Sequence, residues 1–401
     1  MILKNILVFS FVVLATFGGF SQKEDFNVTY KTTIKVGAER VSEYLPLLKG
    51  KKVGIVANHT SVINKTHLVD SLLKLGVNIV KVFSPEHGFR GTANAGEKVK
   101  SSKDIKTGLP IVSLYGKNKK PTKEQVKDLD VIIFDIQDVG ARFYTYISTM
   151  HYIMESASEN GKEVLILDRP NPNGFYIDGP VLESKFKSFV GMHPIPVVHG
   201  LTVGELAKMI NGENWLKNKK KCKLKVIKCE NYTHKDFYKL PIAPSPNLPN
   251  MSAIYLYPSL CFFEGTSVSV GRGTDFPFQV IGSPFVKKTQ FSFVPKSNTG
   301  SKNPKHKNKL CNGYNLSVFG FVYVRNANKL YFNWLIAMNK STKGSKYITR
   351  ASFFDKLAGN DKLRKQIEAN KTEEQIRDSW QKDLDLYKVM RKKYLLYKDF
   401  N

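Results

Sequence analysis

The chain of 401 residues carries 62 lysines and arginines against 34 aspartates and glutamates, a formal net charge of +28, and 42% of it is hydrophobic. This length and hydrophobic content suffice for two globular domains and exclude a chain that is disordered as a whole. The positive charge favours polyanionic partners, and it does not by itself distinguish nucleic acid, an acidic membrane surface and an anionic cell-wall polymer.

Residues 1–21 have the pattern of a secretory signal peptide. Lys4 precedes an apolar run over residues 6–20, and small residues precede Gln22. The run is short for a transmembrane helix, although an uncleaved N-terminal anchor is an alternative. We therefore expect an exported protein, periplasmic or secreted, without stable membrane insertion after signal cleavage. Export also argues against nucleic acid as the partner.

Apolar runs alternate with stretches of helical spacing along the next part of the chain. Strands are expected at residues 53–57, 79–83, 111–114, 131–134 and 164–167, with helices at 41–48, 67–75, 121–129 and 145–158. The runs are continuous, as in parallel strands that are buried on both faces. The predicted fold class is α/β, with a Rossmann-like parallel sheet domain over residues 38–240.

A Pro-rich stretch at residues 241–249 marks the expected boundary to a second, smaller α+β domain over residues 241–401. Before it, Thr202 is placed to cap a helix at 203–210. After it we expect a basic, mobile loop at 296–309. Helices are expected at 352–357, 361–369 and 372–396, the last opening on a capping box of Thr372 and Gln375.

The cysteines and glycines give little sign of a cofactor. Cys222 and Cys229 flank a short strand at 224–227, so they form either a disulfide or two buried free thiols. With Cys261 and Cys311 they show no metal-site spacing. No GxGxxG follows the first strand, which argues against a dinucleotide. We therefore expect neither a metal nor an organic cofactor.

The stretch Ser84–Gly91 places Glu86, His87 and Arg90 on a turn after the second strand. Pro85 and Gly88 break regular structure there. Ligands of open α/β sheets bind at this carboxyl edge of the strands. The alternative is a surface loop in which Glu86 and Arg90 pair with each other in solvent.

The other strand ends add carboxylates, amides and aromatic rings that fit sugar binding and acid/base chemistry. They supply Asn58, His59, Tyr115, Asp135, Gln137, Asp138, Arg142, Asp168, Arg169 and Asn171. Glycoside hydrolysis usually needs two carboxyl groups. Glu86 is the candidate general acid and Asp138 its candidate partner, ahead of Asp135. Asp168 and Arg169 are expected to form a structural ion pair.

A metallohydrolase is the main alternative among enzymes. His59, His87, Asp135, Asp138 and His199 could supply ligands, but the HExxH, HxxEH and HxH spacings are absent. A serine hydrolase is disfavoured because the chain has no GxSxG.

Several long motifs resemble those of the bacterial exo-β-N-acetylmuramidase (NamZ-like) family. They are residues 57–60 (ANHT), 84–91 (SPEHGFRG), 134–146 (FDIQDVGARFYTY), 167–174 (LDRPNPNG), 244–247 (PSPN), 263–266 (FEGT), 271–274 (GRGT), 379–380 (SW) and 391–397 (RKKYLLY). The resemblance extends from about residue 38 to the C-terminus.

The resemblance implies a Rossmann-like domain and a smaller C-terminal domain that completes the cleft holding the site. It implies an exported glycoside hydrolase that removes N-acetylmuramic acid from non-reducing ends of peptidoglycan fragments, with Glu86 matching the family's proposed catalytic glutamate. Asp138 as the second catalytic group is an inference from the strand ends. Substrate-binding roles are expected for Asn58, His59, His87, Arg90, Tyr115, Gln137, Arg142, Tyr144, Asn171, Asn247, Glu264 and Arg272.

The expected partners are therefore muramic acid saccharides derived from peptidoglycan. A guanidinium group matches a carboxylate in a bidentate way, so Arg90, Arg142 or Arg272 could bind the lactyl carboxylate of muramic acid. A non-catalytic cell-wall binding protein and a metal-dependent exported hydrolase are the competing functions.

Overall fold

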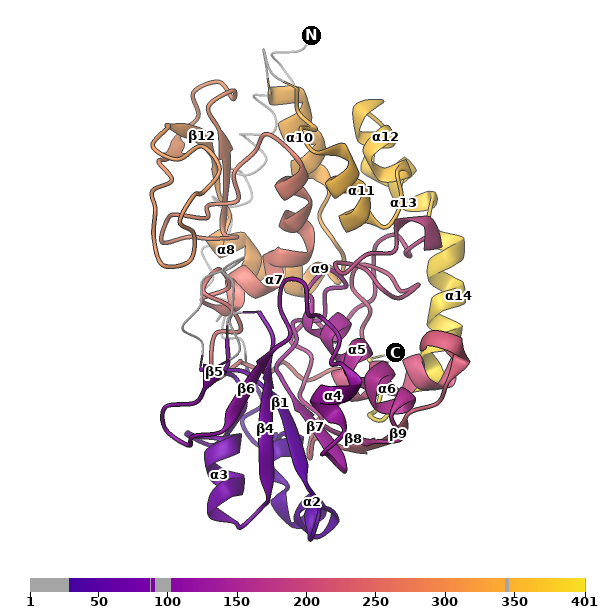
Figure 1. Ribbon diagram of the computed structural model, residues 1–401. Coiled ribbons are helices and arrows are strands. Elements are labelled where there is room, and N and C mark those ends of the chain that lie inside the picture. Colours follow the sequence, from indigo (N-terminus) through magenta and orange to yellow (C-terminus); the bar gives the residue numbers. More distant parts are fainter. Residues whose placement is uncertain (1–28, 87, 91–101, 343–345, 401) are drawn as a thin grey trace.

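The computed structural model describes residues 29–86, 88–90, 102–342 and 346–400 (Figure 1). The predicted signal peptide and His87 lie outside these residues. No helix of the described part is long and apolar enough to cross a membrane.

A seven-stranded sheet forms the N-terminal part, in the order β5-β6-β4-β1-β7-β8-β9. Its strands are β1 (Val53–Ala57), β4 (Ile79–Ser84), β5 (Ser102–Lys103), β6 (Pro110–Ser113), β7 (Val131–Asp135), β8 (Glu163–Leu167) and β9 (Lys223–Ile227). Six strands are parallel, which confirms the predicted α/β class. The short edge strand β5 is antiparallel to β6, so the sheet is mixed and not purely parallel as we expected.

Helices cover both faces of this sheet, which explains the continuous apolar runs. On one face, α2 (Val41–Leu48) and α3 (Leu68–Lys74) share a hydrophobic cluster with Ile133 of β7. On the other face, α5 (Tyr146–Glu159) and α6 (Val203–Gly212) share a second cluster with Ile132. Successive strand residues point to opposite faces, so burial of both faces requires apolar residues throughout.

The remaining elements of the N-terminal part are short. They are η1 (Gly37–Glu39), the hairpin of β2 (Val62–Ile63) and β3 (Thr66–His67), α4 (Lys123–Val126), η2 (Ser184–Phe186) and η3 (Lys217–Lys219). Thr202 caps α6 as predicted, because its side chain accepts a hydrogen bond from the Glu205 amide.

The C-terminal part combines a three-stranded antiparallel sheet, in the order β10-β12-β11, with helices. Its elements are α7 (Met251–Leu260), η4 (Cys261–Gly265), β10 (Val280–Ser283), β11 (Phe291–Phe293), β12 (Cys311–Asn315), α8 (Ser317–Phe319), η5 (Gly320–Val324), α9 (Arg325–Ala327), α10 (Asn333–Ser341), α11 (Ala351–Ala358), α12 (Lys362–Glu368), α13 (Glu373–Asp378) and α14 (Gln381–Lys392). The larger hydrophobic cluster runs from Phe134 of β7 into Phe262 and Trp380, so one core joins the two parts.

The prediction of one long helix at 372–396 is wrong, because the structure has two shorter helices there. The predicted capping box of Thr372 and Gln375 opens α13. The chain then breaks at Trp380, whose backbone leaves the helical region at φ −122°. Its buried ring packs 5.4 Å from the Phe332 ring. Anchoring this indole in the core therefore redirects the chain into α14.

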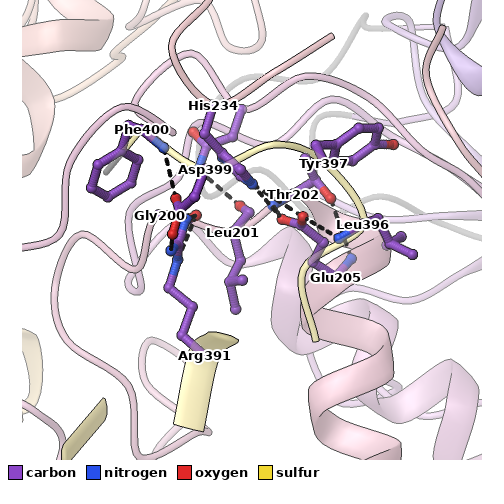
Figure 2. Close-up of polar contacts among 12 residues, drawn as sticks. Gly200, Leu201, Thr202, Glu205, His234, Arg391, Leu396, Tyr397, Asp399 and Phe400 are labelled. Atoms are coloured by element: carbon purple, nitrogen blue, oxygen red, sulfur yellow. Dashed lines mark hydrogen bonds and ion pairs between the residues drawn. The ribbon is translucent and has the colours of Figure 1, made fainter. Parts of the chain in front are cut away.

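The end of the chain folds back onto the N-terminal part (Figure 2). Arg391 donates two hydrogen bonds to the Gly200 carbonyl and pairs with Asp399 at 2.7 Å. The Leu396 amide donates to a Glu205 carboxylate oxygen on α6 at 2.8 Å. The last residues thus belong structurally to the sheet domain, although they lie far from it in sequence.

The four cysteines all lie in the described residues and carry free, buried thiols. Of the two possibilities for Cys222 and Cys229, the structure therefore has free thiols. Cys229 bonds through its Sγ to the Asp168 carbonyl at 3.3 Å.

Candidate active site

A pocket with about 470 Å³ of empty space, part of it open solvent, lies where the carboxyl ends of the strands meet the C-terminal part. Its lining residues come from both parts of the chain: Glu86, Tyr144, Thr145, Tyr146, Ser245, Asn247, Leu248, Tyr257, Arg272 and Phe278. The pocket therefore lies between the strand ends and the smaller C-terminal part, where the resemblance predicted a cleft.

Glu86 is the carboxylate of this pocket, and it lies on the turn directly after β4. The Tyr115 hydroxyl, on the turn after the neighbouring strand β6, donates a hydrogen bond to its Oε1 at 3.1 Å. Burial, and after it the charge of Glu86, raises the pKa of Tyr115 to about 12. The same two causes raise the pKa of Tyr146 at the start of α5. Two phenols that remain protonated thus surround the carboxylate.

Aromatic rings form a wall of the pocket. The Tyr144 ring lies 5.0 Å from Tyr146 and 5.8 Å from Tyr257, and Tyr257 lies 4.9 Å from Phe278, all in edge-on geometry. The Tyr144 hydroxyl donates to the Pro244 carbonyl at 2.8 Å, which joins the two parts of the chain. Such a wall offers apolar surface with a few polar groups, as is usual for small-molecule sites.

Arg272 is the cation that lines the pocket. Its Nε donates to Oε1 of Glu264 at 2.6 Å, and its guanidinium lies 4.9 Å above the Phe278 ring. The ion pair with Glu264 and the contact with the Phe278 ring therefore fix the orientation of the guanidinium group. A guanidinium fixed in this way is suited to a planar anion such as a carboxylate.

Some predicted site residues line the pocket, others brace the turns near it, and others are held elsewhere in the fold. Glu86, Tyr144, Asn247 and Arg272 line the pocket, and Tyr115 and Glu264 bond to lining residues. We predicted no role for four other lining residues, which are Tyr146, Ser245, Tyr257 and Phe278. Tyr146 and Ser245 stand inside the motifs that carried the resemblance, whereas Tyr257 lies on α7, a helix that we did not predict.

A second group braces the turns behind the pocket. The Gln137 amide donates to the carbonyls of Asp138 and Pro170, and the Asn171 amide donates to the Leu201 carbonyl. Asn58 accepts hydrogen bonds from the backbone and hydroxyl of Thr60.

His59 joins the strand-end turn to the Pro-rich stretch. Its Nε2 donates to the Ala243 carbonyl at 2.8 Å. Burial lowers the pKa of His59, so the ring is neutral near pH 7. The structure gives it a bracing contact next to the pocket wall.

Two arginines that we expected to bind substrate are held elsewhere. Arg142 is completely buried and donates to the carbonyls of Pro180, Ile195 and Leu357 at 2.7–2.9 Å. Burial lowers the pKa of Arg142 to about 9. Such a group supports the fold and does not face the pocket.

Arg90 ties the Glu86 turn to its neighbours. It pairs with Asp104 at 2.7 Å and with Asp70 of α3 at 3.1 Å. The alternative of an isolated Glu86–Arg90 pair is therefore wrong, and Arg90 is not among the residues that line the pocket, so its role at the substrate stays a prediction.

Asp138 lies behind the pocket wall. Its Oδ2 accepts a hydrogen bond from the Gly140 amide at 2.7 Å, and burial raises its pKa to about 7. Strand β1 lies between β4 and β7, which carry Glu86 and Asp138. Neighbouring strands are about 4.8 Å apart, so the two turns begin about 10 Å apart. This spacing disfavours Asp138 as a direct nucleophile.

The expected Asp168–Arg169 ion pair is also wrong. Arg169 pairs with Asp135 at 2.6 Å, on the end of the adjacent strand. Asp168 instead accepts hydrogen bonds from the hydroxyls of Thr202 and Tyr397. Consecutive residues after β8 point to opposite sides, so neighbours in sequence take different partners.

Among the described residues, no group of three or more His, Cys, Asp or Glu side chains is placed to hold a metal ion. Of the five ligands considered from the sequence, His87 is not described. Asp135 is committed to Arg169, and His59 to a backbone carbonyl.

Known proteins resemble the chain over nearly its whole length. Residues 53–252 and 255–397 match the N-terminal and C-terminal models of exo-beta-N-acetylmuramidase NamZ. Peptidoglycan beta-N-acetylmuramidase NamZ of Bacillus subtilis is 40% identical over 398 residues, covering 92% of each protein.

Two crystal structures of DUF1343 family proteins from Bacteroides fragilis have the same fold. One is 48% identical with a TM-score of 0.85, and the other is 34% identical with a TM-score of 0.78. Each match covers 92% of this chain and all of the other. The chain belongs to the exo-β-N-acetylmuramidase NamZ family.

Proposed function

We propose that the protein is a glycoside hydrolase that releases N-acetylmuramic acid from the non-reducing ends of peptidoglycan fragments. The observation that carries this proposal is the pocket in which Glu86 and Arg272 are joined by an aromatic wall. Family membership and the similarity to the Bacillus subtilis enzyme support it.

The chemistry assigns Glu86 the role of proton donor to the glycosidic oxygen. A positioned general acid contributes about 10²–10⁴ in rate. Tyr115 orients this carboxyl group through its hydrogen bond to Oε1. The tyrosine and phenylalanine rings pack against the apolar face of the sugar ring.

Arg272 binds the lactyl carboxylate, the group that distinguishes muramic acid from glucosamine. Among the three arginines considered from the sequence, it lines the pocket, while Arg90 and Arg142 are committed to other partners. Its support by Glu264 and Phe278 fixes the guanidinium plane, which favours a bidentate contact.

The anomeric carbon is then attacked by a water molecule or by the 2-acetamido group of the substrate itself. Both routes avoid a covalent bond to Asp138, in agreement with the intervening strand β1. The anomer released first, followed by NMR, separates them: inversion requires water, and retention without an adduct on Asp138 requires the acetamide.

We also propose that the protein is exported, because residues 1–21 have the charge and hydropathy pattern of a signal peptide. The mass of the protein recovered from the periplasm or medium tests this. Removal of about twenty N-terminal residues supports export, and full-length protein confined to the cytoplasm contradicts it.

A chromogenic β-N-acetylmuramide, assayed beside the matching β-N-acetylglucosaminide, tests the activity. We expect release from the muramide, little release from the glucosaminide, and no effect of a chelator. No release from either sugar would favour a cell-wall binding protein. Hydrolysis of esters that the chelator abolishes would favour the metal-dependent hydrolase.

A further inference from the structure

In one segment of the chain, every lysine, arginine, aspartate or glutamate position is occupied by a basic residue. Residues 276–354 contain eleven lysines and two arginines, and they contain no aspartate or glutamate. The rest of the chain mixes charges of both signs. The segment therefore supplies 13 of the 28 net positive charges, and it borders the pocket, because Phe278 lines it.

The loop between β11 and β12 is fastened to the pocket wall. The Gly300 carbonyl accepts a hydrogen bond from the Asn247 side chain at 2.8 Å, and the Lys296 amide donates to the Gly273 carbonyl at 2.8 Å. Farther along, Lys305 donates to the carbonyls of Phe263 and Val268. These bonds hold a loop that we had expected to be mobile, and they place it beside Asn247 and Arg272.

The β10–β11 connection lies against this loop, because the Phe285 ring is 5.9 Å from the His306 ring. We call five exposed lysines of the loop and the connection the cationic rim. They are Lys287, Lys288, Lys296, Lys307 and Lys309. Within the part of the chain that the structure describes, none of the five takes part in an ion pair. Unpaired ammonium groups on a surface raise the local concentration of anions.

Exposed aromatic rings accompany the lysines. Phe285 is 40% and Tyr314 is 45% exposed, although large apolar side chains are usually buried. An aromatic ring offers a flat apolar face that packs on the C–H groups of a sugar ring. The surface thus combines positive charge with the stacking surfaces that a glycan requires.

We propose that the cationic rim binds the glycan chain that extends from the pocket, with its lysines on the lactyl carboxylates of successive muramic acid residues. This inference rests on the proposed function and extends it from the terminal sugar to the substrate's polymeric part. An enzyme that removes a terminal sugar holds that sugar in the pocket. The remaining chain must leave past the pocket mouth, where the loop beside Asn247 lies.

In peptidoglycan the lactyl carboxyl of each muramic acid is bound to a peptide as an amide, and it becomes a free carboxylate when that peptide is removed. A peptide-free strand therefore carries one carboxylate on every second sugar. Such a strand is a regular polyanion, and a segment without carboxylates is its electrostatic complement. The proposed substrate is therefore a peptide-free glycan longer than a disaccharide.

The test compares two variants of the full chain. The rim variant replaces Lys287, Lys288, Lys296, Lys307 and Lys309 with alanine. The control variant replaces five exposed lysines at the β9 edge with alanine: Lys217, Lys220, Lys223, Lys225 and Lys228. Both variants lose the same charge, and Figure 1 shows β9 and β12 on opposite sides of the molecule.

The quantity measured is kcat/KM for peptide-free glycan chains divided by kcat/KM for the chromogenic muramide. We expect this ratio to fall about tenfold in the rim variant and to change little in the control, because steering by charge is worth at least that much. Salt should lower the ratio for the unmodified protein, since the screening length shrinks from about 10 Å at 0.1 M to about 3 Å at 1 M. An unchanged ratio, or an equal fall in both variants, overturns the proposal.

A binding measurement on a variant without catalytic activity tests the role of the rim independently of turnover. The Glu86→Gln chain, with and without the rim substitutions, is titrated with peptide-free glycan, and we expect a Kd about tenfold higher when the rim is neutral. Unchanged glycan affinity, with rim-dependent binding to anionic lipid vesicles, would assign the rim to a membrane surface and refute the proposal. Failure of the unmodified protein to hydrolyse the muramide would refute the proposed function alone.

Discussion

The hydroxyl of Tyr115 donates a hydrogen bond of 3.1 Å to Oε1 of Glu86. The two residues lie on turns that follow β6 and β4, which are neighbours in the sheet. The parallel arrangement of these strands therefore brings a phenol and a carboxylate together at the wall of the pocket. The bond fixes the orientation of the carboxyl group before substrate arrives.

Replacing Tyr115 with phenylalanine removes this bond and leaves the ring in place. We expect kcat to fall about tenfold with little change in KM, because the hydrogen bond stabilises the negative charge that develops on Glu86 as it gives up its proton, and a bond to a charged group is worth about 1.5–3 kcal/mol. Steady-state kinetics on the chromogenic muramide measure the split. A rise in KM at constant kcat would instead make Tyr115 a substrate ligand.

The sequence predicted the sheet well because each strand obeys a local rule. Residues 53–57 and 131–134 are apolar at every position, since helices cover both faces of the sheet, and this pattern does not depend on distant contacts. The capping side chains Thr202 and Thr372 are equally local, because each bonds to an amide three residues away.

The partners of the polar residues were harder to predict because they lie far away in sequence. Arg142 bonds to carbonyls up to 215 residues away, and nothing in its own neighbourhood identifies backbone oxygen as its partner. Glu86 could be found from its position after a strand. Tyr257 and Phe278 could not, because the C-terminal part delivers them to the pocket only after folding.

Replacing Arg272 with alanine should reduce discrimination between muramic and glucosamine substrates. One charged hydrogen-bonded contact is worth about 1.5–3 kcal/mol, so kcat/KM for the muramide should fall roughly tenfold or more. Activity on the glucosaminide, which has no carboxylate, should change much less. The lysine variant Arg272→Lys is the matched control and should recover part of the selectivity. Equal losses on both sugars would show that Arg272 acts on the pocket's structure.

Replacing Arg142 with alanine should destabilise the protein without altering sugar selectivity. The change leaves three buried carbonyls without their donor, and each such loss costs about 1–3 kcal/mol. Chemical denaturation measures the free energy of unfolding. Unaltered stability together with a selective loss of muramide hydrolysis would return Arg142 to the binding site.

Asp138 makes stability depend on pH. Its pKa is about 7 in the folded protein, raised by burial, against an ordinary value near 3.8. The folded protein therefore holds the Asp138 proton more tightly than the unfolded chain does. The stabilisation from this proton is fully present below about pH 4, and the free energy of unfolding falls as the pH rises through 7. Asp138→Asn should remove this dependence and raise stability at pH 8 by on the order of 3 kcal/mol.

The same variant tests the role of Asp138 in the reaction. We expect Asp138→Asn to keep turnover within about tenfold of the unmodified enzyme, well short of the effect of a lost proton donor. Unfolding curves at pH 5 and pH 8, beside kinetics at one pH, give both results. A loss of turnover as large as that of Glu86→Gln would make Asp138 the second catalytic group.

The turnover of Glu86→Gln on the chromogenic β-N-acetylmuramide is the most direct measurement of the central claim. Glutamine keeps the shape of the side chain but cannot donate the proton, so we expect kcat to fall at least about 100-fold with an unchanged unfolding transition. Glu163→Gln, at a surface position where β8 begins, is the control and should turn over normally. Near-normal turnover by a folded Glu86→Gln protein would contradict the assignment of Glu86 as the catalytic acid.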